Sequence, residues 1–301
     1  MKRHHWLILT AAVVVAIGLV AGCGGSSPGA TPSATETTST PATSEPPQTT
    51  SPTTTASQSP SPSPTRNLTV ALYFLRGEHV GVAHRTIPFT LATGGAAMQL
   101  LVAGPNSTEK AAGLGTTIPA GTEFLGLVIK DGVATVNLSG TYASGGGSLS
   151  MFTRLAQVVY TLTQFPAVKG VNFRLDGEKV TVFSSEGIAL DHPQTRADYE
   201  DQTPAILVEN PAVGDTVSSP MRLSGTANVF EAVFQMRLVD ANGKILAKGM
   251  VQATSGTGTR GTFSTPVLFA PTTPTGTLVV YEVSMKDGSR INVVRIPLAF
   301  K

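Results

Sequence analysis

Cys23 is the residue best suited to covalent modification, because it is the only cysteine and a short hydrophobic leader precedes it. Residues 20–23 read Val-Ala-Gly-Cys, which matches the bacterial lipobox of aliphatic, small, small, Cys. The apolar run before it, residues 6–20, is shorter than the roughly 20 residues that a membrane-spanning helix needs. We therefore predict a cleaved signal peptide over 1–22 and a lipid, such as palmitate, on Cys23. The alternative is an ordinary signal peptide that contains an incidental cysteine.

The residue types that carry most enzymatic chemistry form no recognisable motif in this sequence. No histidine stands in an H-E-x-x-H spacing, which would place two metal ligands on one helix face. Neither Gly-x-Ser-x-Gly nor a P-loop occurs, and residues 145–148, Gly-Gly-Gly-Ser, lack the lysine that holds a phosphate. We therefore predict no enzyme, no catalytic residue, no metal and no cofactor. The histidines beyond the signal are His79, His84 and His192.

Four acidic residues cluster in a polar stretch, residues 191–203, which we predict to be a linker between two domains. A glycosidase holds two carboxylates rigidly at about 5 Å or at about 6.5 to 9.5 Å. A linker does not hold such a geometry, so we favour solvated charge over an acid/base pair. The four residues are Asp191, Asp198, Glu200 and Asp201.

Glu231 is different, because it interrupts an apolar run that reads as a strand. Alternation of side chains along that strand predicts that Glu231 points away from Phe230. One interpretation is an exposed charge, paired with Arg222 or Arg237 and worth about 0 to 1 kcal/mol. The other is a contact with a partner protein, and we retain Glu231 as a candidate for that role.

The segment between the lipidation site and the folded part is rich in Ser, Thr and Pro. Residues 26–65 contain no aromatic or large aliphatic side chain, so they cannot build a core. We predict that residues 23–66 are a disordered tether, and O-glycosylation of it remains open. Of 21 basic residues two lie in the signal, against 19 acidic residues in all, and this balance argues against nucleic acid as a partner.

Residues 67–190 predict an α+β domain with the element order β-α-β-β-α-β-β. Asp-Gly pairs at 131–132 and 176–177 favour tight hairpin turns. Thr93 is the expected N-cap of the first helix, and Ser148 or Ser150 that of the second. The expected elements are strand 68–75, a helix burying Ala96, Ala97, Leu100 and Leu101, strands 124–129 and 133–138, a helix with the apolar stripe Leu149, Phe152, Leu155, Val159 and Leu162, and strands 171–175 and 180–183.

Residues 204–301 show no helical periodicity and predict an all-β sandwich similar to an immunoglobulin domain. The Cys and Trp hallmarks of antibody domains are absent, because the only Trp lies in the signal. Asn-Gly at 242–243 and Asp-Gly at 287–288 supply turns. The expected strands are 205–209, 221–226, 232–239, 244–253, 261–269, 277–285 and 290–298.

In these two regions the sequence resembles a GerMN domain followed by a Gmad2 immunoglobulin-like domain, both named from bacterial sporulation and spore-germination proteins. The resemblance spans about residues 67–300. It implies an interaction domain without catalysis, similar to small ring-building modules of envelope assemblies. The segments that carry it are 100–105, 118–122 and 157–165 in the first domain, and 219–220, 224–225, 227–232, 260–263 and 296–297 in the second.

The residues and the resemblance together predict a cell-envelope lipoprotein on the extracytoplasmic face of the membrane. We expect it to act without catalysis, as a module that binds another envelope protein or a second copy of itself. The alternative is a lipoprotein that binds cell-wall glycan or a solute, which an aromatic-lined groove would favour. Aromatic residues make up 6% of the chain.

Overall fold

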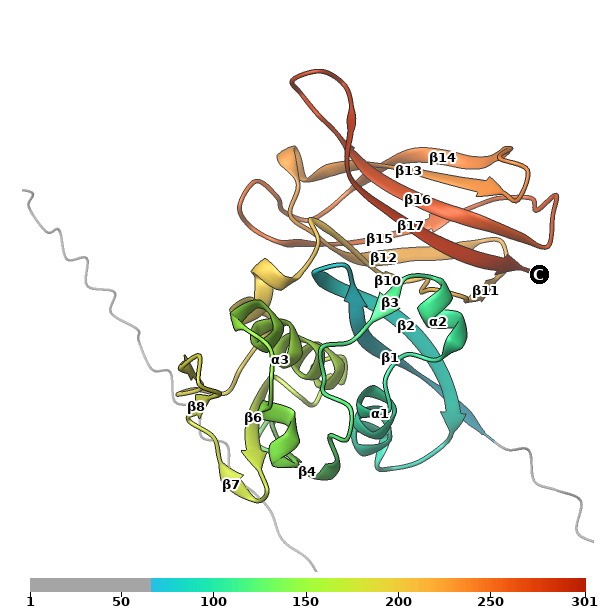
Figure 1. The fold of residues 1–301 in the computed structure, drawn as a ribbon. Coiled ribbons are helices and arrows are strands. Elements are labelled where there is room, and N and C mark those ends of the chain that lie inside the picture. Colours follow the sequence, from blue (N-terminus) through green and yellow to red (C-terminus); the bar gives the residue numbers. More distant parts are fainter. Residues whose placement is uncertain (1–65) are drawn as a thin grey trace, which may run out of the picture. The chain divides into compact units, whose positions relative to one another are not determined.

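The computed structural model describes residues 66–301. The signal peptide at 1–22, Cys23 and all but the last residue of the tether lie outside the described residues. Within residues 66–301, no helix has the length and apolar character to cross a membrane. The predicted fold class is confirmed, because an α/β domain is followed by a β-sandwich (Figure 1).

The first domain opens with a long antiparallel hairpin of β1 and β2, which pair along their whole length. Gly77 turns the hairpin with φ +62°, a conformation that glycine adopts without steric cost. The predicted element order lacks β2, because Gly81, His84 and Arg85 break up its apolar residues. The elements of this half are β1 (Asn67–Arg76), β2 (His79–Pro88), α1 (Thr93–Val102), α2 (Ser107–Ala111) and β3 (Leu114–Gly115).

A second, four-stranded sheet in the order β4-β5-β6-β7 and a two-stranded sheet, β8-β9, complete the domain. Asp131 and Gly132 have φ of +51° and +79° and form the predicted tight turn between β4 and β5. The long helix α3 joins the parallel strands β5 and β6 as a crossover connection. The elements are β4 (Phe124–Lys130), β5 (Val133–Leu138), α3 (Ser148–Leu162), β6 (Gly170–Leu175), β7 (Glu178–Lys179), β8 (Val182–Phe183) and β9 (Ile188–Ala189).

Three local expectations about the helices are wrong. Thr93 is the first residue of α1 rather than its N-cap, and its hydroxyl donates backwards to the Thr90 carbonyl at 2.7 Å. Gly147 is the N-cap of α3, and no side chain caps that end. Leu149 is 50% exposed, whereas Leu155 and the later apolar positions are buried.

Polar side chains on the buried face of α3, together with Gln164 just after its C-cap, hold β1. Gln164 acts like a neighbouring strand, since its Oε1 accepts the Ala71 N–H at 2.8 Å and its Nε2 donates to the Ala71 carbonyl at 2.7 Å. One turn earlier, Thr161 accepts the Tyr73 N–H at 3.2 Å, and Gln157 donates to the Tyr73 carbonyl at 3.3 Å. These side chains satisfy backbone groups of β1 that no strand pairs, which explains why amides and hydroxyls are buried here.

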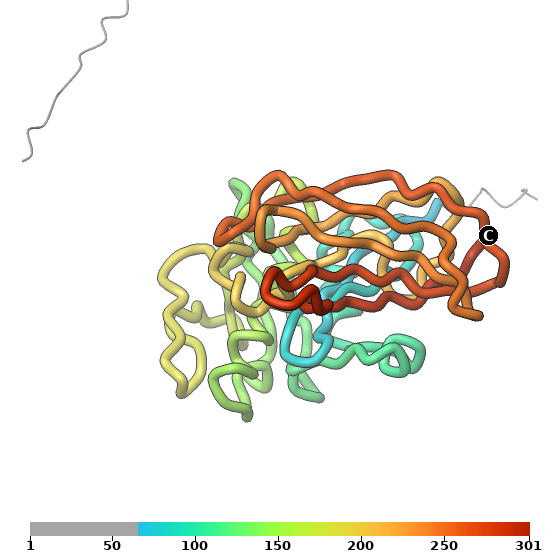
Figure 2. The backbone as a smooth tube through the Cα atoms, turned by 90° about the horizontal axis from the view of Figure 1, so that it is seen from above, coloured from blue at the N-terminus to red at the C-terminus, as the bar shows by residue number. Residues whose placement is uncertain are grey.

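The second domain is a sandwich of a three-stranded sheet, β10-β12-β15, and a five-stranded sheet, β11-β17-β16-β13-β14. Phe234, Met236 and Leu238 alternate into the core. Figure 2 traces the long strands as they run back and forth along the sandwich. All seven predicted strands are present, with one short addition, β11: β10 (Ile206–Asn210), β11 (Thr216–Val217), β12 (Met221–Ala227), β13 (Val233–Asp240), β14 (Ile245–Gln252), β15 (Gly261–Val267), β16 (Thr275–Val283) and β17 (Arg290–Phe300).

Residues 191–203, which we expected to be a solvated linker, form an ordered connection. Gln194 exchanges two backbone hydrogen bonds with Val171 of β6, at 2.8 and 2.9 Å. A 3-10 helix, Arg196–Gln202, follows and buries Tyr199, whose hydroxyl donates to the Gln194 side chain at 2.8 Å. One aromatic anchor among polar residues therefore fixes the path of this segment.

Candidate functional site

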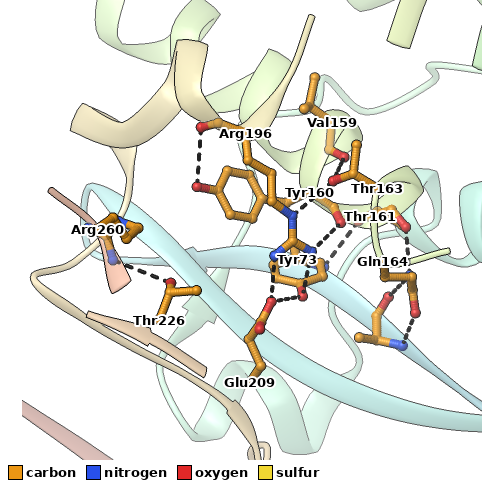
Figure 3. A network of polar contacts seen from close by, with 11 residues as sticks. Tyr73, Val159, Tyr160, Thr161, Thr163, Gln164, Arg196, Glu209, Thr226 and Arg260 are labelled. Carbon is orange, nitrogen blue, oxygen red and sulfur yellow. Dashed lines mark hydrogen bonds and ion pairs between the residues drawn. The ribbon is translucent and has the colours of Figure 1, made fainter. Parts of the chain in front are cut away.

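Arg196 lies where the two domains meet and donates hydrogen bonds to both (Figure 3). Its Nη1 donates to Glu209 Oε1 on β10 at 2.7 Å, and its Nη2 donates to the Tyr73 hydroxyl on β1 at 3.0 Å. Tyr73 donates its own hydroxyl hydrogen to the same Glu209 oxygen. Tyr73 belongs to the first domain and Glu209 to the second, so these three side chains tie the domains together.

The surroundings of Arg196 hold its guanidinium in one orientation. Its Nε donates to the Thr163 hydroxyl at 2.9 Å, and its charge lies 4.7 Å from the centre of the Tyr160 ring. Burial raises the pKa of Tyr73 well above its usual range, so its phenol remains a protonated donor. The arrangement suits a rigid joint rather than proton transfer.

Two further contacts connect the domains through β2. His84 Nδ1 lies 2.8 Å from Asp215 Oδ2, with both side chains largely buried. Ala83 next to it forms a parallel bridge with Val213. The buried apolar residues of both domains also form one continuous cluster. We infer that the two domains are held in a fixed arrangement and behave as one body.

The other sequence-derived candidates take structural or solvated positions. His192 contacts Asp191 at 2.7 Å and Asp198 at 3.2 Å on an exposed surface, and His79 is exposed at the β1–β2 turn. Asp198 accepts the Thr195 N–H at 2.7 Å, which caps the 3-10 helix. In the part of the chain that the structure describes, no three His, Cys, Asp or Glu residues are placed to hold a metal ion.

The glycine loop before α3 is held by Arg154, whose side chain is buried. The guanidinium donates to the carbonyls of Thr117, Tyr142, Ser144 and Gly145, three of them at 3.0 to 3.1 Å. A buried cation therefore takes its partners from the backbone, and the loop wraps around it.

Glu231 lies in a turn before β13 and not within a strand. Its φ of +54° and its exposed side chain exclude the predicted alternation with Phe230, which is itself 48% exposed. The Glu231 N–H donates to the Thr257 hydroxyl at 3.0 Å. Within residues 66–301 its carboxylate has no basic partner within ion-pair distance, neither Arg222 nor Arg237 included.

The outer edge of β4 is the most apolar accessible strand of the first domain. Leu125, Val128 and Ile129 are 46%, 65% and 45% exposed. β4 ends its sheet, and among the described residues its backbone makes hydrogen bonds only to β5. Leu91, 95% exposed, precedes α1, which packs against β4. An edge of this kind is a template for a further strand.

The sequence analysis predicted neither the joint at Arg196 nor the exposed edge of β4. Arg196 and Tyr73 lie far apart in sequence and meet only because α3 brings the connection back to β1. The polar residues that hold β1 could be recognised in the sequence, because they recur at three- and four-residue intervals along the apolar helix α3 and just past its end. These residues are Thr153, Gln157, Thr161 and Gln164.

Comparison with known proteins agrees with this two-domain organisation. Residues 71–181 match a family described as sporulation and spore germination, and residues 205–289 match the immunoglobulin-like domain of bacterial spore germination.

Among solved structures, the first GerMN domain of the sporulation protein GerM from Bacillus subtilis is 23% identical, with a TM-score of 0.37 over 44% of this chain and 99% of that chain. The tandem GerMN domains of GerM are 17% identical, with a TM-score of 0.40 over 67% of this chain and 61% of that chain. No curated protein matches the chain. The chain is thus similar, over residues 71–181, to the sporulation and spore germination family and, over residues 205–289, to the immunoglobulin-like domain of bacterial spore germination.

Proposed function

We propose that this protein is a lipid-anchored module on the extracytoplasmic face of a bacterial membrane, where it binds an envelope protein without catalysing a reaction. The family matches support a place in sporulation or germination, and the lipobox at Cys23 supports the anchor. The observation that carries the binding role is the exposed apolar edge of β4. Strand addition to an open edge supplies affinity through backbone hydrogen bonds and specificity through alternate side chains.

The rigid joint at Arg196 supports the same proposal. Because the domains are tied by ion pairs and a continuous core, a partner on β4 would meet a preorganised surface. Preorganisation lowers the entropy cost of association. Glu231 remains a second candidate contact, on the surface of the other domain beside exposed Phe230 and Met285.

Val128→Lys should weaken partner capture at least about tenfold, because it places a charge on the β4 edge and blocks strand addition. Val128 is 65% exposed, so the melting temperature should change little. The measurement is crosslinked pull-down of the lipoprotein from intact cells, quantified by mass spectrometry. Val182→Lys is the matched control, since Val182 is 58% exposed in the same domain. Glu231→Ala in the same assay tests the second contact.

Full capture by a folded Val128→Lys protein would contradict the role of β4. If Val182→Lys weakens capture equally, the effect is one of added charge and the edge has no special part. Unchanged capture by Glu231→Ala would leave Glu231 an exposed surface charge.

Cys23→Ala should release the protein from the membrane fraction once its signal has been cleaved, because the lipid and not a helix provides the anchor. Fractionation of cells with detection of the mature chain measures this. The wild-type N-terminal peptide should carry an acyl mass on Cys23. A mature Cys23→Ala chain that stays with membranes would refute the anchor.

A further inference from the structure

A cavity of about 300 Å³ lies between the β1–β2 hairpin of the first domain and strands β10 and β17 of the second. Its wall is mainly aliphatic and includes Val80, Val82, Val294 and Ile296, with His79 and Asn292 as polar members besides Arg76. A cavity of about 150 Å³ holds a benzene molecule, so this one has room for about a dozen heavy atoms. Its size is at the lower end of small-molecule sites, which often lie between domains.

Arg76 lies at this cavity without a carboxylate partner. Its Nη1 donates to the Arg295 carbonyl, and its Nη2 lies 3.4 Å from the Ala112 carbonyl. Among the described residues no acidic group is within ion-pair distance of Arg76. A guanidinium has five N–H donors, so several remain for another acceptor.

Burial lowers the pKa of Arg76, which reflects the cost of removing its charge from water. An anion beside the guanidinium would offset this cost, and a planar carboxylate matches the fork of its N–H groups. The aliphatic wall next to Arg76 favours a hydrocarbon group over a sugar, because a sugar would leave hydroxyls unpaired against valine and isoleucine.

We propose that this cavity binds a short-chain amphipathic carboxylate, with its head on Arg76 and its hydrocarbon tail against the valines of β2 and β17. The ligand would contact both domains at once, so its binding would favour their docked arrangement. This role is separate from the protein-binding role of β4, and each can fail without the other.

The test uses the chain without residues 1–23, which retains the unit formed by residues 60–301. Octanoate and octanol are titrated separately by isothermal calorimetry, below the concentrations at which octanoate forms micelles. Octanoate should bind at one site and raise the melting temperature, and octanol, which lacks the charge, should bind at least about tenfold more weakly.

Arg76→Met should weaken octanoate at least about tenfold and leave octanol nearly unchanged. Val294→Phe, which fills the cavity and retains Arg76, should weaken both ligands. It also keeps the test decisive if Arg76→Met fails to fold. The proposal is overturned if octanoate does not bind, if octanol binds equally well, or if folded Val294→Phe protein binds octanoate as the wild type does.

Discussion

Because the buried apolar residues of the two domains form one cluster, we expect the wild type to unfold in a single transition and Arg196→Met to unfold in two. The substitution preserves much of the side-chain length but removes the donors to Glu209, Tyr73 and Thr163. Breaking a buried ion pair costs about 3 to 5 kcal/mol. Arg196 and Glu209 are 29% and 26% exposed, so solvent screening reduces the expected loss to about 2 to 3 kcal/mol.

Differential scanning calorimetry measures this separation, and limited proteolysis between residues 191 and 203 reports the loosened connection. Arg222→Met is the matched control, because Arg222 is exposed on β12 and donates to a single hydroxyl, Ser264 Oγ, at 2.9 Å. A double-mutant cycle with Glu209→Gln isolates the pairwise energy. One unchanged transition in Arg196→Met would show that the shared apolar core joins the domains without this network.

Arg154→Met is expected to lower the free energy of unfolding of the first domain by about 3 to 5 kcal/mol. Hydrogen bonds from a charged donor contribute about 1.5 to 3 kcal/mol each, and Arg154 makes four to backbone carbonyls. Water can rehydrate the Ser144 and Gly145 carbonyls in the loop, so the full sum is not lost. The carbonyl of Tyr142, a fully buried residue, carries the larger cost.

Urea denaturation followed by circular dichroism measures this loss. Arg174→Met serves as its control, because Arg174 lies in the same domain on β6, is exposed and donates to one carbonyl, that of Gly177, at 2.7 Å. That variant should lose less than about 1 kcal/mol. Equal losses in the two variants would mean that the Arg154 bonds exchange with water at no net cost.

Periodicity predicted the second domain better than the first. Strands β12, β13, β15 and β16 alternate between more buried and more exposed positions, as Phe234 and Gln235 do, and polar turns separate the strands. In the first domain β2 breaks that pattern, because His84 faces Asp215 across the domain junction instead of solvent. Its polar residues have partners that only the tertiary structure supplies.

The candidate site was less predictable than the fold. Glu231 was assigned to a strand because its neighbours are apolar, but its left-handed backbone conformation places it in a turn. The joint at Arg196 could not be predicted from the sequence, because Arg196 and Glu209 contact Tyr73 only after the two domains dock. Exposure of β4 depends on its position at the end of a sheet, which strand order determines. Local sequence specifies elements, whereas these sites depend on how the elements are placed.

The grip of α3 on β1 has a mechanical consequence, since the N-terminal segment enters the folded part at Asn67, the first residue of β1. A pull along the axis of β1 would load its hydrogen bonds to β2 in parallel, so they would have to break together rather than one by one. Gln164 and Thr161 add their bonds to the opposite edge of the same strand. Tension directed along β1 would therefore load this strand in shear, with hydrogen bonds holding it at both edges.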